Sequence, residues 1–503
     1  MKPLNFNHWF LVSVFMLATS LASSAQDSPA QLIVHWDRVT REWSSTPTLQ
    51  VVVNPPLRRG TSVHDNAFQA LHDLGADYVR YVPWLPYPRL GVAELAPPKD
   101  GKTSWDFSLI DPMTIDFLEA TKGHSVVLNF STIPQWMYKT DKPVTYPDDP
   151  NTPVWDYEQG TELRDATFKE VADYYARLLS WYTRGGFTDE YGKRHESGYL
   201  YSIPYWEVLN EVDFEHDMTP QAYTPLYDAI VTAMKKVQPG AKFVGVSLAM
   251  PGRNPEFFEY FLNKKNHRPG VPLDYISYHF YAAPAPDETL DIQQHTVFAQ
   301  ADGFLNSVRY VEAIRKRLSP GTGTMINEIG IISADDNGQG DPHHVTKPIP
   351  DSYWNLAGAE YAYILVKLTQ LGIDVVGESQ LVGYPTQFPS VSMVDWNNGK
   401  PNARLWVLKL LRDNFAPGDK IVDFTPPAQP YVAGLAVVTR QGRRRMLLVN
   451  QRGRNFDLSV PGAAGGELDY VDVTTGFGPP ASAKLSSDGF TLRGFSVAVL
   501  TLP

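Results

Sequence analysis

The chain has 503 residues, a formal net charge of -11 and no cysteine. Its length and its 43% share of hydrophobic residues allow a sizeable core and favour a large domain with at least one smaller one. The acidic balance argues against a nucleic-acid partner, and the lack of cysteine excludes disulfides, thiolate zinc sites and cysteine nucleophiles.

The first 25 residues are typical of an export signal. Lys2 supplies a positive start, residues 9–22 ("WFLVSVFMLATSLA") an apolar segment, and residues 23–25 ("SSA") a small-residue cleavage site. A membrane anchor is the alternative, but these 14 apolar residues fall short of the ~20 that span a bilayer. We expect cleavage near Ala25 and a secreted or periplasmic mature chain with no membrane anchor.

Short β-prone runs alternate with longer segments of helical period between residues 48 and 415, which is typical of βα units around a parallel sheet. The eight runs are residues 49–53, 77–82, 125–130, 203–210, 242–249, 273–280, 324–329 and 374–379. Eight such units predict a (β/α)8 barrel, an α/β fold. An open doubly wound sheet is the competing fold, but no glycine-rich phosphate turn follows the first run.

The ends of two helices can be read between these runs. Thr219 and Pro220 have the residue types of an N-cap and a first helical position, and the helix is expected to stop before Pro239. Gly372 is expected to end the helix before the last run.

The pattern changes near the end of the barrel region. Residues 402–415 are expected to form a helix, and residues 416–503 read as short alternating strands of a small β-sandwich. The run 31–37 ("QLIVHWD") has no helical partner, so we assign residues 26–47 to strands that join this sandwich. The basic residues 440–445 ("RQGRRR") are expected in a solvated turn between two strands, with an anion site as the alternative.

Two Asn-Glu pairs stand at the ends of predicted strands. Asn210-Glu211 ends the fourth strand and Asn327-Glu328 the seventh, 117 residues later by the difference of 328 and 211. In a barrel, the carboxyl ends of all strands meet at one mouth, where enzymes of this fold react. Two carboxylates about 5 to 5.5 Å apart can cleave a glycosidic bond with retention of configuration. The sequence therefore predicts Glu211 and Glu328 opposed across a sugar.

The surrounding motifs make a resemblance specific. "WEVLNE" and "INEIG", with "YVRYVPW" on the second strand and "SYHFY" on the sixth, resemble the clan of retaining (β/α)8 glycosidases. Within that clan, "STIPQWM", the acidic segment after Asn210 and the C-terminal sandwich resemble glycoside hydrolase family 39, the family of β-xylosidases and α-L-iduronidases. The resemblance covers roughly residues 75–500. Family members commonly have proline after the acid glutamate, where this chain has Val212.

The resemblance implies roles for individual residues. Glu211 would be the general acid/base and Glu328 the nucleophile, so Glu328 should be ionised and Glu211 protonated before the first step. Asn210 would hydrogen-bond the sugar 2-hydroxyl, and Tyr281 would donate to Glu328. A loop-fixing amide and a core aromatic are the alternatives for Asn210 and Tyr281.

Further candidates follow from chemistry and position. Arg80 lies in an apolar run, where an unpaired charge is costly, so a carboxylate at the mouth is its expected partner; a purely structural ion pair is the alternative. His279 and Tyr281 alternate at the end of the sixth strand, so both can face the mouth. Stacking on sugar faces is the interpretation for three tryptophans near strand ends, with core or rim packing as the alternative: Trp84, Trp136 and Trp396.

The other acidic groups near the fourth strand are expected to have different environments. Glu207 lies four residues before Glu211, so it points to the same side but deeper, where a polar partner inside the barrel is expected. A solvated rim, with one or two groups reaching substrate, is expected for Asp213, Glu215, His216 and Asp217.

Residues 333–344 ("SADDNGQGDPHH") cluster aspartate and histidine after the seventh strand. The stretch lacks the glutamate that ends a calcium loop, and adjacent histidines seldom chelate one zinc well. A mobile lid over the pocket is the preferred interpretation, and we expect no metal and no cofactor.

These observations predict a secreted retaining glycoside hydrolase that is exo-acting and β-xylosidase-like. No arginine or lysine cluster marks a site for a sugar carboxylate, which favours a neutral pentose. The alternatives are α-L-iduronidase, arabinosidase or β-glucosidase/glucanase specificity, a non-catalytic carbohydrate-binding barrel, or a sandwich binding module fused to an unrelated barrel enzyme. The sequence does not set the oligomeric state.

Overall fold

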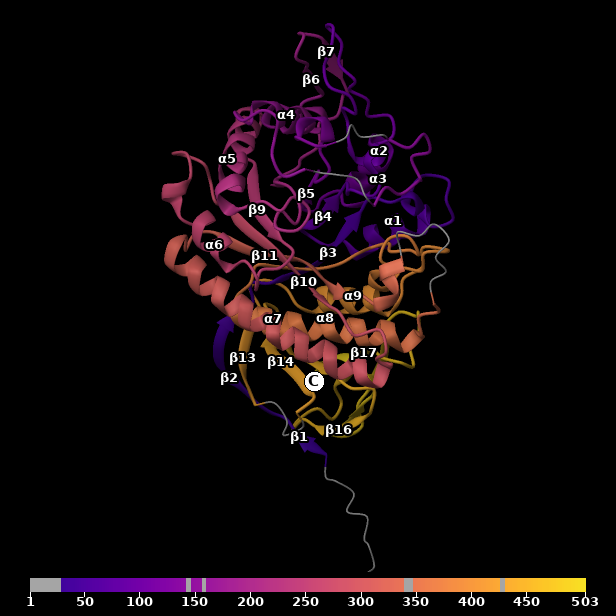
Figure 1. The fold of residues 1–503 in the computed structure, drawn as a ribbon. Helices are drawn as coiled ribbons and strands as arrows, with labels where there is room; N and C mark the ends of the chain where they lie inside the picture. The colour runs from indigo at the N-terminus through magenta and orange to yellow at the C-terminus, as the bar shows by residue number, and fades with distance from the viewer. Residues whose placement is uncertain (1–28, 142–145, 156–159, 339–346, 426–429) are drawn as a thin grey trace, which may run out of the picture.

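The computed structural model describes residues 29–141, 146–155, 160–338, 347–425 and 430–503 (Figure 1). The export signal predicted for residues 1–25 lies outside them, as do residues 339–344 of the segment expected to be a lid. Within the described ranges, no helix is both long enough and apolar enough to cross a membrane.

The centre of the molecule is a closed barrel of eight parallel strands. The strands are β3 (Thr46–Val52), β4 (Val79–Val82), β5 (Val126–Leu128), β8 (Tyr205–Glu207), β9 (Lys242–Leu248), β10 (Tyr275–Ala282), β11 (Gly323–Ile331) and β12 (Val375–Glu378). The eight predicted runs each contain or overlap one of these strands. Pairing of Glu378 with Leu49 closes the barrel between β12 and β3, so the predicted (β/α)8 fold is confirmed and the open sheet is wrong.

Helices follow the strands and surround the barrel (Figure 1). They are α1 (His64–Leu74), α2 (Pro88–Gly91), α3 (Asp111–Ala120), α4 (Lys169–Thr183), α5 (Pro220–Val237), α6 (Pro255–Phe261), α7 (Leu290–Leu318), α8 (Asp351–Leu371) and α9 (Ala403–Asn414). Thr219 caps α5 by accepting from the Ala222 N–H, and Gly372 ends α8 in the left-handed conformation, as predicted. A small hairpin of β6 (Gly186–Thr188) and β7 (Arg194–Glu196), at the top of Figure 1, lengthens the connection from α4 to β8.

The barrel interior has an apolar lower layer. Val127, Val244, Met325 and Val375, from four different strands, form one small buried cluster. The side chains two positions after Val127 and Met325 are Asn129 and Asn327, which both donate to the buried Glu207 carboxylate, one layer closer to the carboxyl ends of the strands. Polar groups occupy that upper layer, and the candidate site lies there.

A two-sheet β-sandwich lies below the barrel in Figure 1. The larger sheet has the order β18-β17-β20-β15-β14-β13-β2, and the smaller one β1-β16-β19. Their strands are β1 (Ala30–Gln31), β2 (Ile33–Glu42), β13 (Lys420–Thr425), β14 (Val432–Val438), β15 (Arg444–Asn450), β16 (Phe456–Ser459), β17 (Glu467–Val471), β18 (Ala481–Lys484), β19 (Gly489–Leu492) and β20 (Val497–Thr501). The N-terminal strand β2 pairs antiparallel with β13. Of the basic residues 440–445, residues 440–443 form the turn from β14 into β15, and Arg444 and Arg445 begin β15.

Alternation along β15 shows that the larger sheet is buried on both faces. Leu447 and Val449 belong to the core shared with the barrel, whereas Met446 and Leu448 belong to the core between the two sheets. Helices α8 and α9 contact the barrel-facing side of this sheet. A strand covered on both faces reads as the continuous apolar run seen in the sequence.

Candidate active site

Glu211 and Glu328 meet at the carboxyl ends of the barrel strands. Glu328 lies in β11 and is in register with His279 of β10, while Glu211 follows β8 by four residues. An oxygen of each carboxylate lies within 4.8 Å of the other. The gap is close to the separation at which one carboxylate can attack a sugar directly.

The backbone around Glu211 is strained. Leu209 and Glu211 have φ angles of 61° and 41°, in the left-handed region that side chains other than glycine rarely adopt. The Asn129 amide donates to the Leu209 carbonyl at 3.0 Å and holds this turn. Such strain is maintained only where surrounding contacts over-determine it, and it clusters at functional sites.

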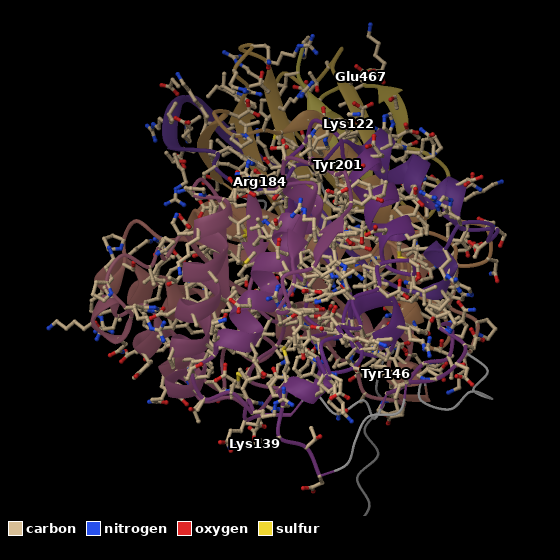
Figure 2. The ribbon with its side chains drawn as sticks, turned by 90° about the horizontal axis from the view of Figure 1, so that it is seen from above. Lys122, Lys139, Tyr146, Arg184, Tyr201 and Glu467 are labelled. Atoms are coloured by element: carbon tan, nitrogen blue, oxygen red, sulfur yellow. The ribbon has the colours of Figure 1, made fainter. Side chains whose placement is uncertain are left out.

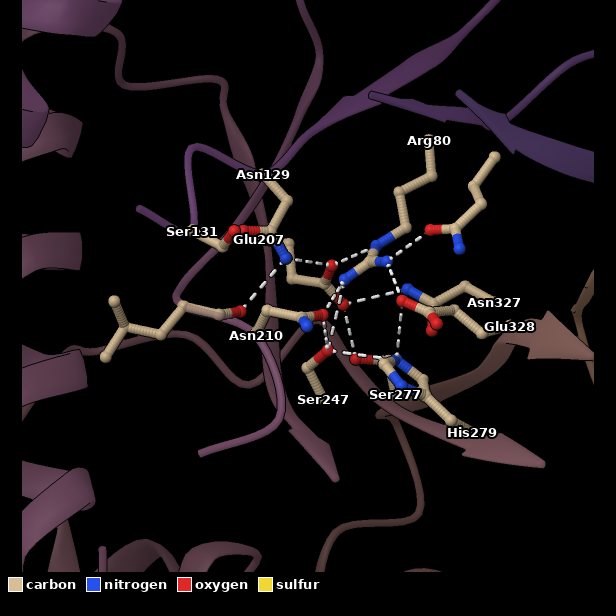
Figure 3. Close-up of polar contacts among 12 residues, drawn as sticks. Arg80, Asn129, Ser131, Glu207, Asn210, Ser247, Ser277, His279, Asn327 and Glu328 are labelled. Atoms are coloured by element: carbon tan, nitrogen blue, oxygen red, sulfur yellow. Dashed lines mark hydrogen bonds and ion pairs between the residues drawn. The ribbon is translucent and has the colours of Figure 1, made fainter. Parts of the chain in front are cut away.

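Arg80 of β4 links both sides of the barrel mouth (Figure 3). Its guanidinium donates to Glu207 at 2.5 Å and to Glu328 at 2.5 Å. The same group donates to the Asn210 carbonyl oxygen at 2.6 Å and to Gln50 at 2.7 Å. The carboxylate partner expected for Arg80 at the mouth is therefore present, and a second one lies deeper.

Glu207 is fully buried and all its contacts are with the interior layer (Figure 3). Besides Arg80, Asn129 donates to its Oε2 at 2.6 Å, and Ser277 and Asn327 donate to its Oε1 at 2.5 and 2.8 Å. This carboxylate has no room for substrate. It holds Arg80 in place below the two facing glutamates.

His279 and Tyr281 both contact the carboxylates. His279 Nδ1 lies 2.8 Å from Glu211, and its Nε2 lies 3.1 Å from Ser247 and 3.6 Å from Glu328. The Tyr281 hydroxyl donates to Glu328 at 2.5 Å, which is the contact that the family resemblance implied. Glu328 therefore receives donors from Arg80 and Tyr281, while Glu211 has His279.

These contacts separate the pKa values of the two glutamates. Burial favours the neutral form of Glu328, but the charges of His279 and Arg80 and the Tyr281 hydrogen bond outweigh it and lower its pKa. Burial, with the charge of Glu328, raises the pKa of Glu211 despite the hydrogen bond from His279. One carboxyl is thus favoured as a carboxylate and the other as an acid, which are the two protonation states that glycoside cleavage requires.

Glu211, His279 and Glu328 also form a group whose ligand atoms are close enough for a metal ion. The Arg80 guanidinium donates to Glu328 within this group, and both His279 nitrogens lie near protein oxygens. A metal ion bound by these three residues would be repelled by the positive charge of Arg80, so the group fits proton transfer better than metal binding.

The prediction that a solvated rim follows Glu211 is only partly correct. Asp217 is exposed, but Asp213 accepts from the backbone N–H groups of Ala249 and Met250. His216 is 1% exposed and stacks on Tyr138. The loop folds inward because the Glu215 N–H donates to the Glu211 carbonyl, which returns the chain over the acid.

Glu215 is the site residue whose environment the sequence did not predict. Its Oε1 accepts from Trp84 Nε1 at 2.5 Å and from Asn210 Nδ2 at 2.8 Å. Burial and the charge of Glu211 raise the pKa of Glu215 to about 8. The available signal was its spacing, since a residue four positions after Glu211 returns to the same side in a helical turn.

The candidate tryptophans lie in different surroundings. Trp84 meets Trp155 edge-on at 5.4 Å, beside Glu215. Trp136 donates to the Glu94 carbonyl and lies under Arg164, and Trp396 meets Trp354 edge-on. No contact given for the described residues joins Trp136 or Trp396 to the glutamate pair, so their stacking on substrate stays a prediction.

One recess of about 440 Å³ lies away from this site. It is lined by Lys122 and Tyr201, on the loops that enter β5 and β8 (Figure 2). These loops belong to the amino ends of the strands, the barrel face opposite to the glutamate pair.

A closed (β/α)8 barrel with two facing carboxyl groups of opposite pKa shift at its carboxyl mouth has the architecture of a glycoside hydrolase. The family model described as glycosyl hydrolases family 39 matches residues 59–328, which is 270 of the 503 residues. The chain belongs to this family, as the sequence motifs predicted.

The chain is similar to one curated protein in sequence and to solved structures in fold. A β-xylosidase of Geobacillus stearothermophilus is 25% identical over 185 residues, which are 37% of this chain and 32% of that protein. The match thus spans about a third of this curated relative. The GH39 β-xylosidase structure from Caulobacter crescentus aligns with a TM-score of 0.59 and 15% identity, over 94% of this chain and 99% of that one. A GH51 arabinofuranosidase from Xanthomonas axonopodis pv. citri aligns with a TM-score of 0.63 and 13% identity, over 94% and 100%.

Proposed function

We propose that the protein hydrolyses glycosidic bonds with retention of configuration, with Glu328 as nucleophile and Glu211 as general acid/base. The observation that carries the proposal is the pair of carboxyl oxygens within 4.8 Å. The opposite pKa shifts of the two glutamates support the same assignment. Family membership supports the reaction class.

The first step uses Glu328 as a carboxylate and Glu211 as an acid. Glu328 attacks the anomeric carbon while Glu211 protonates the leaving oxygen, which breaks the glycosidic bond and forms a glycosyl ester. The ester removes the negative charge of Glu328, which is one of the causes that raise the pKa of Glu211. Glu211 then ionises more easily and takes a proton from the water that cleaves the ester.

A neutral sugar is the substrate class that the site supports. The described cations at the glutamate pair are Arg80 and His279. Arg80 already donates to Glu207, Glu328 and Asn210, and the two ring nitrogens of His279 already lie near Glu211 and Ser247. A sugar carboxylate would meet the Glu328 carboxylate without a free cation among the described residues of this site, and such a contact is repulsive. The β-xylosidase relatives support a pentose, and exo action on a β-xyloside is the preferred specificity.

Aryl glycosides and two single variants test this function. A panel of p-nitrophenyl sugars should give turnover with the β-xyloside above the arabinoside, glucoside and iduronide. Glu328→Ala should lose at least 1,000-fold in kcat, by analogy with the loss of a catalytic nucleophile. Added azide should restore turnover with an inverted glycosyl azide as product.

Glu211→Ala should spare the first step for aryl leaving groups that need no protonation, so a product burst should precede slow turnover. Full activity in both variants would contradict the assignment. If the other aryl glycosides are cleaved and the xyloside is not, only the proposed β-xyloside specificity is contradicted.

We also propose that the chain is exported, because its first 25 residues have the composition of a signal peptide. Expression of the full chain in a bacterial host, followed by N-terminal sequencing of the periplasmic fraction, tests this. A mature N-terminus near Gln26 is expected, and an uncleaved cytoplasmic product would contradict export.

A further inference from the structure

Glu215 is a third carboxyl group at the barrel mouth, and the two-glutamate mechanism does not use it. It lies on the loop that follows Glu211, and the turn between them is closed by hydrogen bonds from the Phe214 and Glu215 N–H groups to the Glu211 carbonyl, each at 2.7 Å. A third hydrogen bond, from the Met218 N–H to the Val212 carbonyl at 2.9 Å, closes the rest of the loop. The backbone thus directs Glu215 inward, while its neighbour Phe214 is 66% exposed.

The carboxyl oxygen Oε1 of Glu215 joins two parts of the site. It accepts from the Asn210 amide nitrogen at 2.8 Å and from the Trp84 indole at 2.5 Å. The other end of the Asn210 amide is held by Arg80, which donates to Asn210 Oδ1 at 2.6 Å. The amide is therefore clamped between a cation on its oxygen and an acceptor on its nitrogen, and this arrangement allows one orientation only.

The contacts with Arg80 and Glu215 leave one hydrogen of the Asn210 amide nitrogen available. An amide nitrogen carries two hydrogens, and Glu215 accepts one of them. Because the orientation of the amide is fixed, the direction of the second hydrogen is fixed as well. Under the proposed function, Asn210 donates to the sugar 2-hydroxyl, a contact that strengthens as positive charge develops on the ring.

Glu215 can accept these bonds without a negative charge. Burial is the main cause that raises its pKa to about 8, followed by the charge of Glu211. Its Oε2 is buried and has no hydrogen-bond partner within the described part of the chain, which leaves a place for the acid proton. A neutral group avoids a further negative charge beside the Glu328 carboxylate.

We propose that Glu215 is a positioning residue, which as a neutral carboxylic acid fixes the Asn210 amide for donation to the 2-hydroxyl of the bound sugar. This inference rests on the proposed function, because it assumes that Asn210 contacts that hydroxyl. It explains why an acidic residue in a surface loop is turned inward against an indole and an amide. It also predicts that the effect of Glu215 depends on a single hydroxyl of the substrate.

The test compares an aryl β-xyloside with its 2-deoxy analogue in the full-length protein. For each variant, the kcat/KM for the xyloside is divided by the kcat/KM for the 2-deoxy analogue. The fraction of folded enzyme cancels in this ratio, so partial misfolding does not change it. Glu215→Leu removes the acceptor, and the ratio should fall about tenfold, as expected for the loss of one oriented hydrogen bond.

Two variants serve as controls. Glu215→Gln keeps an oxygen for Asn210 and Trp84 but cannot ionise, so it should recover the wild-type ratio to within about threefold. Asp217→Asn makes the same carboxyl-to-amide change on an exposed side chain of the same loop, and its ratio should equal that of the wild type.

Each other outcome overturns the inference. An unchanged ratio in Glu215→Leu would show that Glu215 does not act through the 2-hydroxyl. A loss in Glu215→Gln as large as in Glu215→Leu would show that a negative charge is required. In both of these outcomes, turnover by the wild-type protein and azide rescue of Glu328→Ala would still support the proposed function. A wild-type protein that cleaves no glycoside would overturn the proposed function and the inference together.

Discussion

Arg80 stabilises two buried carboxylates in the barrel interior by pairing with both of them. Its guanidinium lies 2.5 Å from both Glu207 and Glu328, and only 1% of the residue is exposed. Burial opposes the charge of Arg80, but the two glutamates outweigh it and raise the pKa of the guanidinium. Removing one partner of such a buried pair typically costs about 3 to 5 kcal/mol, since the remaining charge stays in the interior.

Tyr281 allows a prediction about pH. Burial opposes ionisation of Glu328, and the Tyr281 hydroxyl is one of the groups that nevertheless lower its pKa. Tyr281→Phe removes this donor, so the pKa of Glu328 should rise and more of the nucleophile should be protonated in acid. The acidic limb of the kcat/KM profile should therefore move to higher pH, with the largest loss of activity on the acidic side of the profile.

Tyr278 supplies the matched control for this measurement. It lies three residues earlier on β10, is fully buried, and its hydroxyl has no hydrogen-bond partner among the residues that the structure describes. Tyr278→Phe should leave the pH profile in place. An equal shift in both variants would show that packing, and not the hydrogen bond to Glu328, sets the acidic limb.

At the scale of secondary-structure elements, helix α5 ties the ends of two neighbouring strands together. The Tyr223 hydroxyl donates to the Val208 carbonyl at 2.9 Å and accepts from the Val246 N–H at 3.0 Å. Val246 and Ser247 have φ angles of 72° and 45°, so this tyrosine supports a strained segment of β9. Ser247 in turn contacts His279 and Arg80.

Tyr223→Phe should reduce both stability and activity. Two buried backbone groups would lose their partner, so the free energy of unfolding should fall by about 1 to 3 kcal/mol in chemical denaturation. The kcat should fall as well, because the strained ends of β8 and β9 carry site residues.

Tyr227→Phe is the comparison for Tyr223→Phe. One turn later on α5, the Tyr227 hydroxyl donates to the Pro272 carbonyl at 3.1 Å, in the loop that enters β10. Its loss should lower stability and leave kcat unchanged. Equal kcat in the Tyr223 and Tyr227 variants would contradict the link between α5 and the site.

At the scale of the whole molecule, the barrel and the sandwich are joined where the chain crosses between them. Trp43 lies between β2 and β3, and Phe415 follows α9 before β13. Their rings stack with centroids 5.1 Å apart. The two crossings also exchange backbone hydrogen bonds, from Trp43 N to Asp419 O at 2.7 Å and from Gly418 N to Trp43 O at 2.9 Å.

Trp43→Ala should destabilise the whole protein. Trp43 is 1% exposed, and truncating a buried tryptophan costs about 3 to 5 kcal/mol in unfolding experiments. Trp36→Ala is the matched control, because this half-buried tryptophan lies on β2 and contacts Arg444 through its ring face. Its cost should be less than half as large, and an equal cost for both would contradict a special role of the crossing.

Several features were predictable from the sequence because their causes are local. Continuous apolar runs such as residues 242–249 mark strands covered on both faces, and Thr219 and Gly372 carry the chemistry of helix ends. The two Asn-Glu pairs were readable for the same reason, since position at a strand end follows from strand prediction. Barrel closure then places Glu211 and Glu328 together without further information.

The environment of each site residue could not be read in this way. Glu215 was expected at a solvated rim because it lies in the loop after the fourth strand, yet Trp84, 131 residues earlier in the chain, donates a hydrogen bond to it. In the same way, the five polar partners of Arg80 lie 30 to 248 residues away from it in the sequence.

The sequence by itself determined the barrel, the sandwich and the two opposed glutamates, since residue periodicity and strand-end position act over a few neighbouring residues. Only the tertiary structure decided which glutamate has a lowered pKa, which has a raised pKa and which is turned inward. Those properties depend on burial and on charges contributed by other strands, and the distances that set them exist only after the barrel has closed.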